Sequence, residues 1–186
     1  MNGPEILHLI RHDLQGAVAR QPKPPTPRPL RGSPWVAMSV LQKGIRRGRE
    51  DLALKAAATL LRDAPEKLWR RIGCIAFEDI GVASLETLGL ATVALAGKRH
   101  RSALGGEWAI VSCIISELSR APKCRAADDL LMVCELHPAH AKARVELPLL
   151  TTRDLIAIAT SQGCVQERAL ALWYAFGTDR RPSLPF

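Results

Sequence analysis

The chain has 186 residues, with 26 Lys and Arg against 18 Asp and Glu, and 47% of its residues are hydrophobic. This composition indicates a folded domain with a hydrophobic core and excludes a mainly disordered chain, and no apolar run is long enough to span a bilayer. Nine basic and three acidic side chains lie in residues 1–50, so most of the net charge of +8 is there. A basic segment joined to a nearly neutral one is typical of proteins that bind polyanions.

The five cysteines are odd in number and widely spaced, without a C-x-x-C pair. This pattern argues against a disulfide framework and against a zinc ribbon. Charged residues interrupt the apolar run at the N-terminus, which is therefore not a signal peptide. We expect a soluble protein of the reducing cytoplasm, with no membrane association, no cofactor and no metal.

The N-terminal segment, residues 1–33, is predicted to be a short helix over residues 4–14 followed by a basic linker. Five prolines between residues 22 and 29 exclude a helix there and favour extended polyproline conformations. Such a segment serves either as a tether between parts of the protein or as a docking motif for an aromatic groove or for phosphates. The sequence leaves both possibilities open.

From Trp35 onward, apolar residues recur every three or four positions, which is the spacing of amphipathic helices. Gly or Pro interrupts this pattern at six places. The predicted fold is an all-α, compact bundle of about eight helices over residues 34–178, with the Pro-rich arm before it and a tail at 179–186. The four tryptophans, Trp35, Trp69, Trp108 and Trp173, are predicted to anchor the core.

A basic cluster closes the first helix of this bundle. Lys43, Arg46 and Arg47 stand at positions i, i+3 and i+4, so they share one helix face, and Arg49 follows Gly48. Cations also suit the C-terminal end of a helix, so a solvated helix end explains the cluster as well as a phosphate-binding face does. Lys123, after Pro122, is either a solvated lysine or part of a helix N-terminus that receives a phosphate.

Two other groups of polar residues carry possible chemistry. Glu78 and Asp79 point about 100° apart on a helix, so we expect a structural ion pair with Arg70 or Arg71, or a cap, rather than acid–base catalysis. The stretch from Cys134 to His140 contains possible zinc ligands, but Pro138 breaks the helix and no fourth ligand is near. No catalytic constellation is found, and the protein is predicted not to be an enzyme.

Three motifs occur in a fixed order along the chain: S-x-x-Q-K-x-I-R at 39–46, E-D-I-G at 78–81, and A-P-K at 121–123. In this order the chain resembles, over residues 35–136, the C-terminal helical region of the RarA/MgsA family of AAA+ ATPases, which are related to clamp loaders. The resemblance implies assembly into tetramers and contact with DNA at stalled replication forks. The family's phosphate-binding loop, G-x-x-x-x-G-K-[ST], is absent, Phe77 and Cys124 depart from the family pattern, and no match extends beyond about residue 140.

These observations predict a non-catalytic DNA-binding or replication/repair accessory module that forms a homo-oligomer. Its predicted nucleic-acid contacts are Lys43, Arg46, Arg47, Arg49 and Lys123. A separate AAA+ ATPase or a replication or recombination protein is a possible partner. The alternative is a protein-interaction adaptor that docks a partner through its Pro-rich arm and helical surface, without DNA. Whether the DNA would be single- or double-stranded is left open.

Overall fold

The structure, a computed structural model, describes residues 3–21, 24–178 and 181, without the side chains of residues 3 and 98–100. Within these residues every regular element is a helix, which confirms the predicted all-α fold. Eleven α-helices are present there, and ten of them lie in residues 34–178, where about eight were predicted. Two of them, α6 (Lys98–Ala103) and α9 (Ala141–Glu146), have six residues each and are too short for helical periodicity to reveal them.

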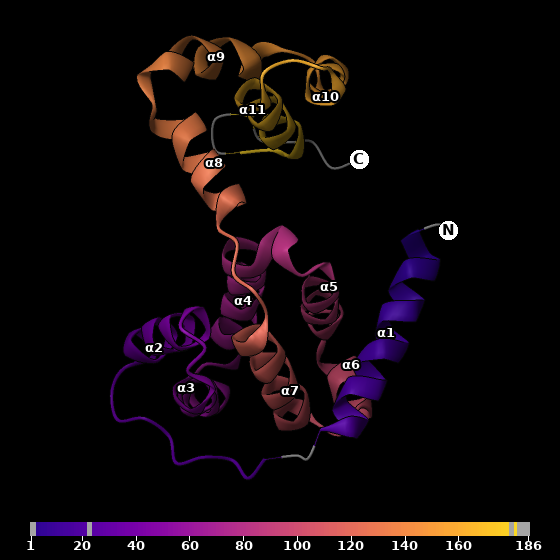
Figure 1. The fold of residues 1–186 in the computed structure, drawn as a ribbon, viewed down its shortest axis with the longest axis vertical. Coiled ribbons are helices and arrows are strands. Elements are labelled where there is room, and N and C mark those ends of the chain that lie inside the picture. Colours follow the sequence, from indigo (N-terminus) through magenta and orange to yellow (C-terminus); the bar gives the residue numbers. More distant parts are fainter. Residues whose placement is uncertain (1–2, 22–23, 179–180, 182–186) are drawn as a thin grey trace. The chain divides into compact units, whose positions relative to one another are not determined.

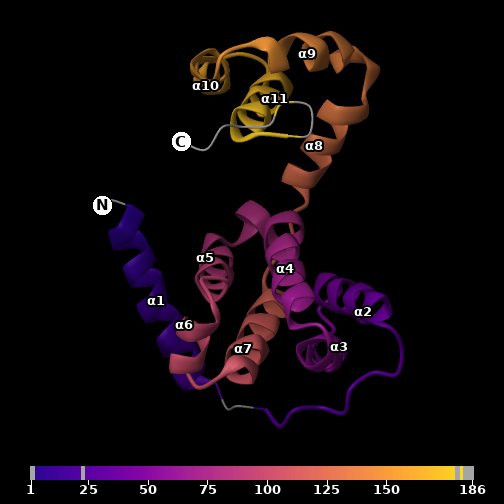
Figure 2. The same ribbon diagram turned by 180° about the vertical axis from the view of Figure 1, so that it is seen from behind.

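The chain divides into two compact units, Met1–Arg125 and Ala126–Phe186, which we call the N-terminal unit and the C-terminal unit (Figures 1 and 2). The boundary falls inside the range predicted as one helical domain. The N-terminal unit contains α1 (Gly3–Arg20), α2 (Pro34–Arg46), α3 (Glu50–Asp63), α4 (Pro65–Ile75), α5 (Leu85–Ala94), α6 and α7 (Glu107–Arg120). The C-terminal unit contains α8 (Ala126–Leu136), α9, α10 (Thr152–Thr160) and α11 (Val165–Phe176). The tail predicted at 179–186 lies outside the described residues apart from Arg181.

Helices end where Gly and Pro were predicted to interrupt the chain. Gly48, between α2 and α3, has φ +65°, a conformation that favours glycine, and Pro65 is the first residue of α4. After α4 the chain makes a π-helical turn, Ala76–Ile80, which ends at Gly81 with φ +49°. This turn carries Asp79, and its wider winding rotates the side chains after Ala76 away from the α-helical pattern of α4.

The core of the N-terminal unit is built around α7. Its residues Ile110, Val111, Ile114, Ile115 and Leu118 are fully buried. Helices α2 and α3 approach each other closely, because a Cβ on Gly44 would lie only 3.1 Å from the backbone nitrogen of Ala53. The small residues at this crossing allow the two helices to pack as a tight pair.

Two of the predicted tryptophan anchors are confirmed, and one is wrong. Trp69 and Trp108 are almost completely buried, and Trp173 is half-buried against the core of the C-terminal unit. Trp35 instead exposes 70% of its surface. It lies in the first turn of α2, in line with Gln42 and Arg46 and outside the buried face of the helix.

The Pro-rich arm is attached to its own unit. Helix α1 is longer than predicted. The chain from residue 24 onward passes below α3 in Figure 1, and again in the reverse view of Figure 2. The indole Nε1 of Trp108 donates a hydrogen bond to the carbonyl of Pro24 (2.9 Å), and the backbone nitrogen of Leu30 donates one to Oγ1 of Thr59 (2.8 Å). The segment from residue 24 to residue 30 is therefore held at both ends.

The C-terminal unit has a separate core. Leu155, Leu170 and Tyr174 are fully buried in it. Its first helix, α8, nevertheless leaves apolar side chains exposed, among them Met132 (50%) and Leu136 (67%). No helix in the described part of either unit has the length and apolar character needed to cross a bilayer.

Candidate nucleic-acid interface

The predicted basic cluster lies at the C-terminal end of α2 and in the turn to α3. Lys43 and Arg47 are exposed, and within the described residues neither forms an ion pair. Arg49 is also exposed, and its Nε lies 3.3 Å from Oδ1 of Asp51. Hydrogen bonding from Arg49 lowers the pKa of Asp51. Because this pair is fully hydrated, it leaves Arg49 accessible to another anion.

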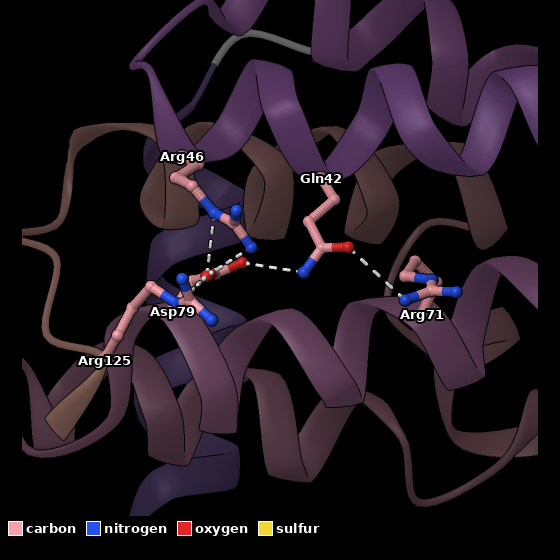
Figure 3. A network of polar contacts seen from close by, with 5 residues as sticks. All are labelled: Gln42, Arg46, Arg71, Asp79 and Arg125. Atoms are coloured by element: carbon pink, nitrogen blue, oxygen red, sulfur yellow. Dashed lines mark hydrogen bonds and ion pairs between the residues drawn. The ribbon is translucent and has the colours of Figure 1, made fainter. Parts of the chain in front are cut away.

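Arg46, unlike Lys43 and Arg47, is paired, and its side chain points toward a buried carboxylate (Figure 3). Its Nε and Nη2 each lie 2.9 Å from Oδ1 of Asp79, a residue with no exposed surface. Nε2 of Gln42 donates a hydrogen bond to Oδ2 of Asp79 (3.1 Å), and Nε of Arg125 lies 3.5 Å from Oδ1. The backbone nitrogen of Cys124 donates to the carbonyl of Asp79 (2.9 Å). Asp79 therefore ties α2 and the chain after α7 to the π-turn.

The predicted partners of this carboxylate were wrong. Asp79 pairs with Arg46 and Arg125 and not with Arg70 or Arg71. The π-turn explains the difference, since it places Asp79 opposite α2 rather than back along α4. Arg46 consequently has a structural role, although its side chain is still 38% exposed.

Lys123 is close to the same end of the unit, but its ammonium group is occupied. It donates hydrogen bonds to the carbonyls of Leu118 (3.0 Å), Ser119 (3.1 Å) and Ala121 at the C-terminal end of α7. Burial lowers the pKa of Lys123, and the nearby charge of Asp79 opposes this effect. The lysine thus caps a helix by satisfying its last carbonyls, which is a different role from either sequence interpretation.

A second group of cations, missed from the sequence, lies between α2 and α4. Lys67, Arg70 and Arg71 of α4, together with Trp35 and Met38 of α2, line a shallow pocket of about 120 Å³. Nζ of Lys67 lies 5.7 Å from the centre of the Trp35 ring, and Nη1 of Arg71 donates to Oε1 of Gln42 (3.4 Å). Figure 3 shows how Gln42 joins this group to Asp79. The spacing of Trp35, Gln42 and Arg46 along one stripe was the only sequence signal for this surface.

The possible zinc ligands of the C-terminal unit have other contacts. Sγ of Cys134 donates a hydrogen bond to the carbonyl of Gln166 (3.3 Å), and Nδ1 of His137 accepts one from the backbone nitrogen of Ala139 (3.3 Å). In the described residues, no three His, Cys, Asp or Glu side chains are grouped so as to hold a metal ion.

The excess of positive charge is confined to the N-terminal unit. Its residues 1–125 include 20 Lys and Arg against 11 Asp and Glu, whereas residues 126–186 include 6 against 7. The one fully buried acid near α2, Asp79, is compensated by two of these cations. A polyanion would therefore be attracted to the N-terminal unit.

No protein-family model matches the chain, and no curated protein matches it either. The chemistry of this surface and the motif resemblance described above are therefore the basis for assigning a function.

Proposed function

We propose that this protein is a non-catalytic module that binds DNA, serves replication or repair, and self-associates. The observation that carries the proposal is the group of exposed cations at the end of α2. Lys43 and Arg47 have no acidic partner in the described residues, and Arg49 has only a hydrated one. Cations in this condition can neutralise backbone phosphates without first breaking an internal ion pair.

A double variant tests the proposal without disturbing the fold. Lys43→Gln with Arg47→Gln leaves Arg46 and its bond to Asp79 intact and keeps helix propensity nearly constant. We expect weaker binding to duplex DNA, about equally on all sequences, because phosphate contacts carry little sequence information. The slope of log affinity against log salt should fall by about 2, close to 0.9 for each lost contact.

The matched control makes the same change of charge in the C-terminal unit. Lys142 and Arg153 are exposed there, and Lys142→Gln with Arg153→Gln should leave both the affinity and the salt slope unchanged. Equal losses in the two double variants would mean that binding follows net charge alone. Wild-type binding that does not depend on salt, or no binding to any DNA, would contradict the proposed function.

Self-association is supported by the exposed apolar side chains of α8. Leu131, Met132, Val133 and Leu136 expose between 36% and 67% of their surface, which is unfavourable in water and suits a contact with a second copy. Light scattering should give a mass above the 20.3 kDa of the single chain at micromolar concentration. The double variant Met132→Lys with Leu136→Lys should have the 20.3 kDa mass of the single chain. A wild-type protein that stays monomeric over a hundredfold range of concentration would refute this part of the proposal.

The adaptor alternative has less support. Its docking element was the Pro-rich arm, and this arm is bonded to Trp108 and Thr59 of its own unit. A partner would first have to release both hydrogen bonds, which lowers its net affinity. The exposed surface of α8 remains available to a partner protein in either case.

A further inference from the structure

The exposed indole of Trp35 is the most unusual apolar feature of the N-terminal unit. Tryptophan is among the most hydrophobic side chains, yet this one exposes 70% of its surface. The Lys67 ammonium group lies over one side of the ring, 5.7 Å from its centre. The residue therefore offers a large exposed aromatic surface beside a cation.

Cations extend from Trp35 along the groove between α2 and α4. Lys67 and Arg71 are half-buried and Arg70 is exposed, and in the described residues none of the three forms an ion pair with an acid. Arg71 makes one long hydrogen bond to the neutral amide of Gln42. The charge of these three side chains is therefore available to an anion that enters the groove.

At the far end of the groove, Arg46 and Arg125 pair with the carboxylate of Asp79 (Figure 3). The positive charge available in the groove is therefore that of Lys67, Arg70 and Arg71, beside the exposed Trp35.

From this arrangement we propose that the α2–α4 groove binds single-stranded nucleic acid. One base stacks on Trp35, and the phosphates that follow it contact Lys67, Arg70 and Arg71. An aromatic face beside a line of cations is the combination used by proteins that bind single strands without sequence preference. This inference rests on the proposed function and specifies which form of nucleic acid this groove recognises.

A duplex would use only half of this surface. In a double helix the faces of the bases are covered by their neighbours in the stack, so Trp35 has nothing to stack on, while the cations can still contact phosphates. The exposed Lys43 and Arg47, on the other side of Arg46, supply duplex contacts without any aromatic group. The structure therefore separates a single-strand site, which needs Trp35, from a general phosphate-binding surface, which does not.

Trp35→Ala tests this separation in the full chain. Fluorescence anisotropy would measure binding to a labelled oligothymidylate of about 20 nucleotides and to a duplex of similar length. We expect Trp35→Ala to weaken oligothymidylate binding by about tenfold or more, with an unchanged salt slope and little change on the duplex. Trp35→Phe keeps an aromatic face and should retain part of the affinity. Lys67→Gln with Arg71→Gln should lower both the affinity and the salt slope on the single strand.

The matched control is Phe176→Ala, which removes an aromatic side chain that is also 70% exposed but lies in the C-terminal unit. It should bind both probes as the wild type does. Circular dichroism would check that the Trp35→Ala variant is folded. If the folded variant binds oligothymidylate as tightly as the wild type, or loses the same fraction of its affinity for both probes, the single-strand site is refuted while the proposed DNA binding stands. If the wild type binds neither probe, both the single-strand site and the proposed function fail.

Discussion

The ion pair between Arg46 and Asp79 should respond unequally to the loss of its two members. Arg46→Gln leaves a carboxylate with no exposed surface, which keeps its contacts with Gln42 at 3.1 Å and Arg125 at 3.5 Å and has the charge of Lys123 nearby. Removing one partner of a buried ion pair costs about 3–5 kcal/mol. Because the Arg46 side chain is 38% exposed and Arg125 remains, we expect the lower end of this range, about 3 kcal/mol of unfolding free energy.

The reciprocal change should be milder. Asp79→Asn keeps the shape of the side chain and one acceptor oxygen, and the released cations can be hydrated because Arg46 and Arg125 are 38% and 43% exposed. The cost should be that of weakened hydrogen bonds, about 1–2 kcal/mol. In the double variant, Arg46→Gln with Asp79→Asn, no charge is left buried. Its loss of unfolding free energy should therefore be smaller than the sum of the two single losses by at least about 1 kcal/mol.

Urea denaturation of the wild type, the two single variants and the double variant measures this cycle. Far-ultraviolet circular dichroism and tryptophan fluorescence are recorded together, and coincident transitions allow the free energies to be compared. Arg62→Gln serves as a control, because its ion pair with Asp63 is exposed and its loss should leave the midpoint nearly unchanged. The reasoning is refuted if Asp79→Asn costs as much as Arg46→Gln, or if the two costs simply add.

Three further predictions concern packing, the arm and the thiols. Gly44→Ala should lower the melting temperature, although alanine has the higher helix propensity, because the new Cβ would lie 3.1 Å from the backbone of α3. An unchanged melting temperature would contradict the close packing of α2 and α3. Thr59→Val removes the second of the two hydrogen bonds that hold the arm, the one at Leu30, so trypsin should cleave after Arg31 faster than in the wild type. An equal rate of cleavage would mean that this hydrogen bond does not restrain the arm. Burial raises the pKa of Cys113 to about 11, so at about pH 8 iodoacetamide should modify the exposed Cys164 and spare Cys113. Peptide mass spectrometry would measure the labelling of each cysteine, and equal labelling would contradict the burial of Cys113.

The fold was predictable to the extent that its signals are local. Gly48, Pro65 and Gly81 end or begin helices through their own backbone preferences, so the breaks could be read directly from the sequence. The six-residue helices α6 and α9 could not, because one and a half turns contain too few apolar positions to show a period. The hydrogen bonds that hold the arm join residues far apart in the chain, and nothing in the proline pattern indicates them.

The candidate site was only partly predictable for a related reason. Helical spacing indicated that Lys43 and Arg47 lie near each other and away from the core, and the structure leaves both exposed. The direction of Arg46 depends on the π-turn, which has no clear signature in the sequence, and so the partner of Asp79 was missed. Trp35 was assigned to the core by its residue type and by its helical spacing with Met38 and Leu41, but it lies at the edge of that apolar stripe and is exposed.

The attachment at Asp79 also has a mechanical consequence. The backbone of Cys124 and the side chain of Arg125 both bond to Asp79, and these are the last residues before α8 begins. A pulling force applied to the chain from Ala126 onward would therefore load these two bonds first, before it could reach the C-terminal end of α7. The π-turn would act as an anchor that protects the central helix of the N-terminal unit from strain generated farther along the chain.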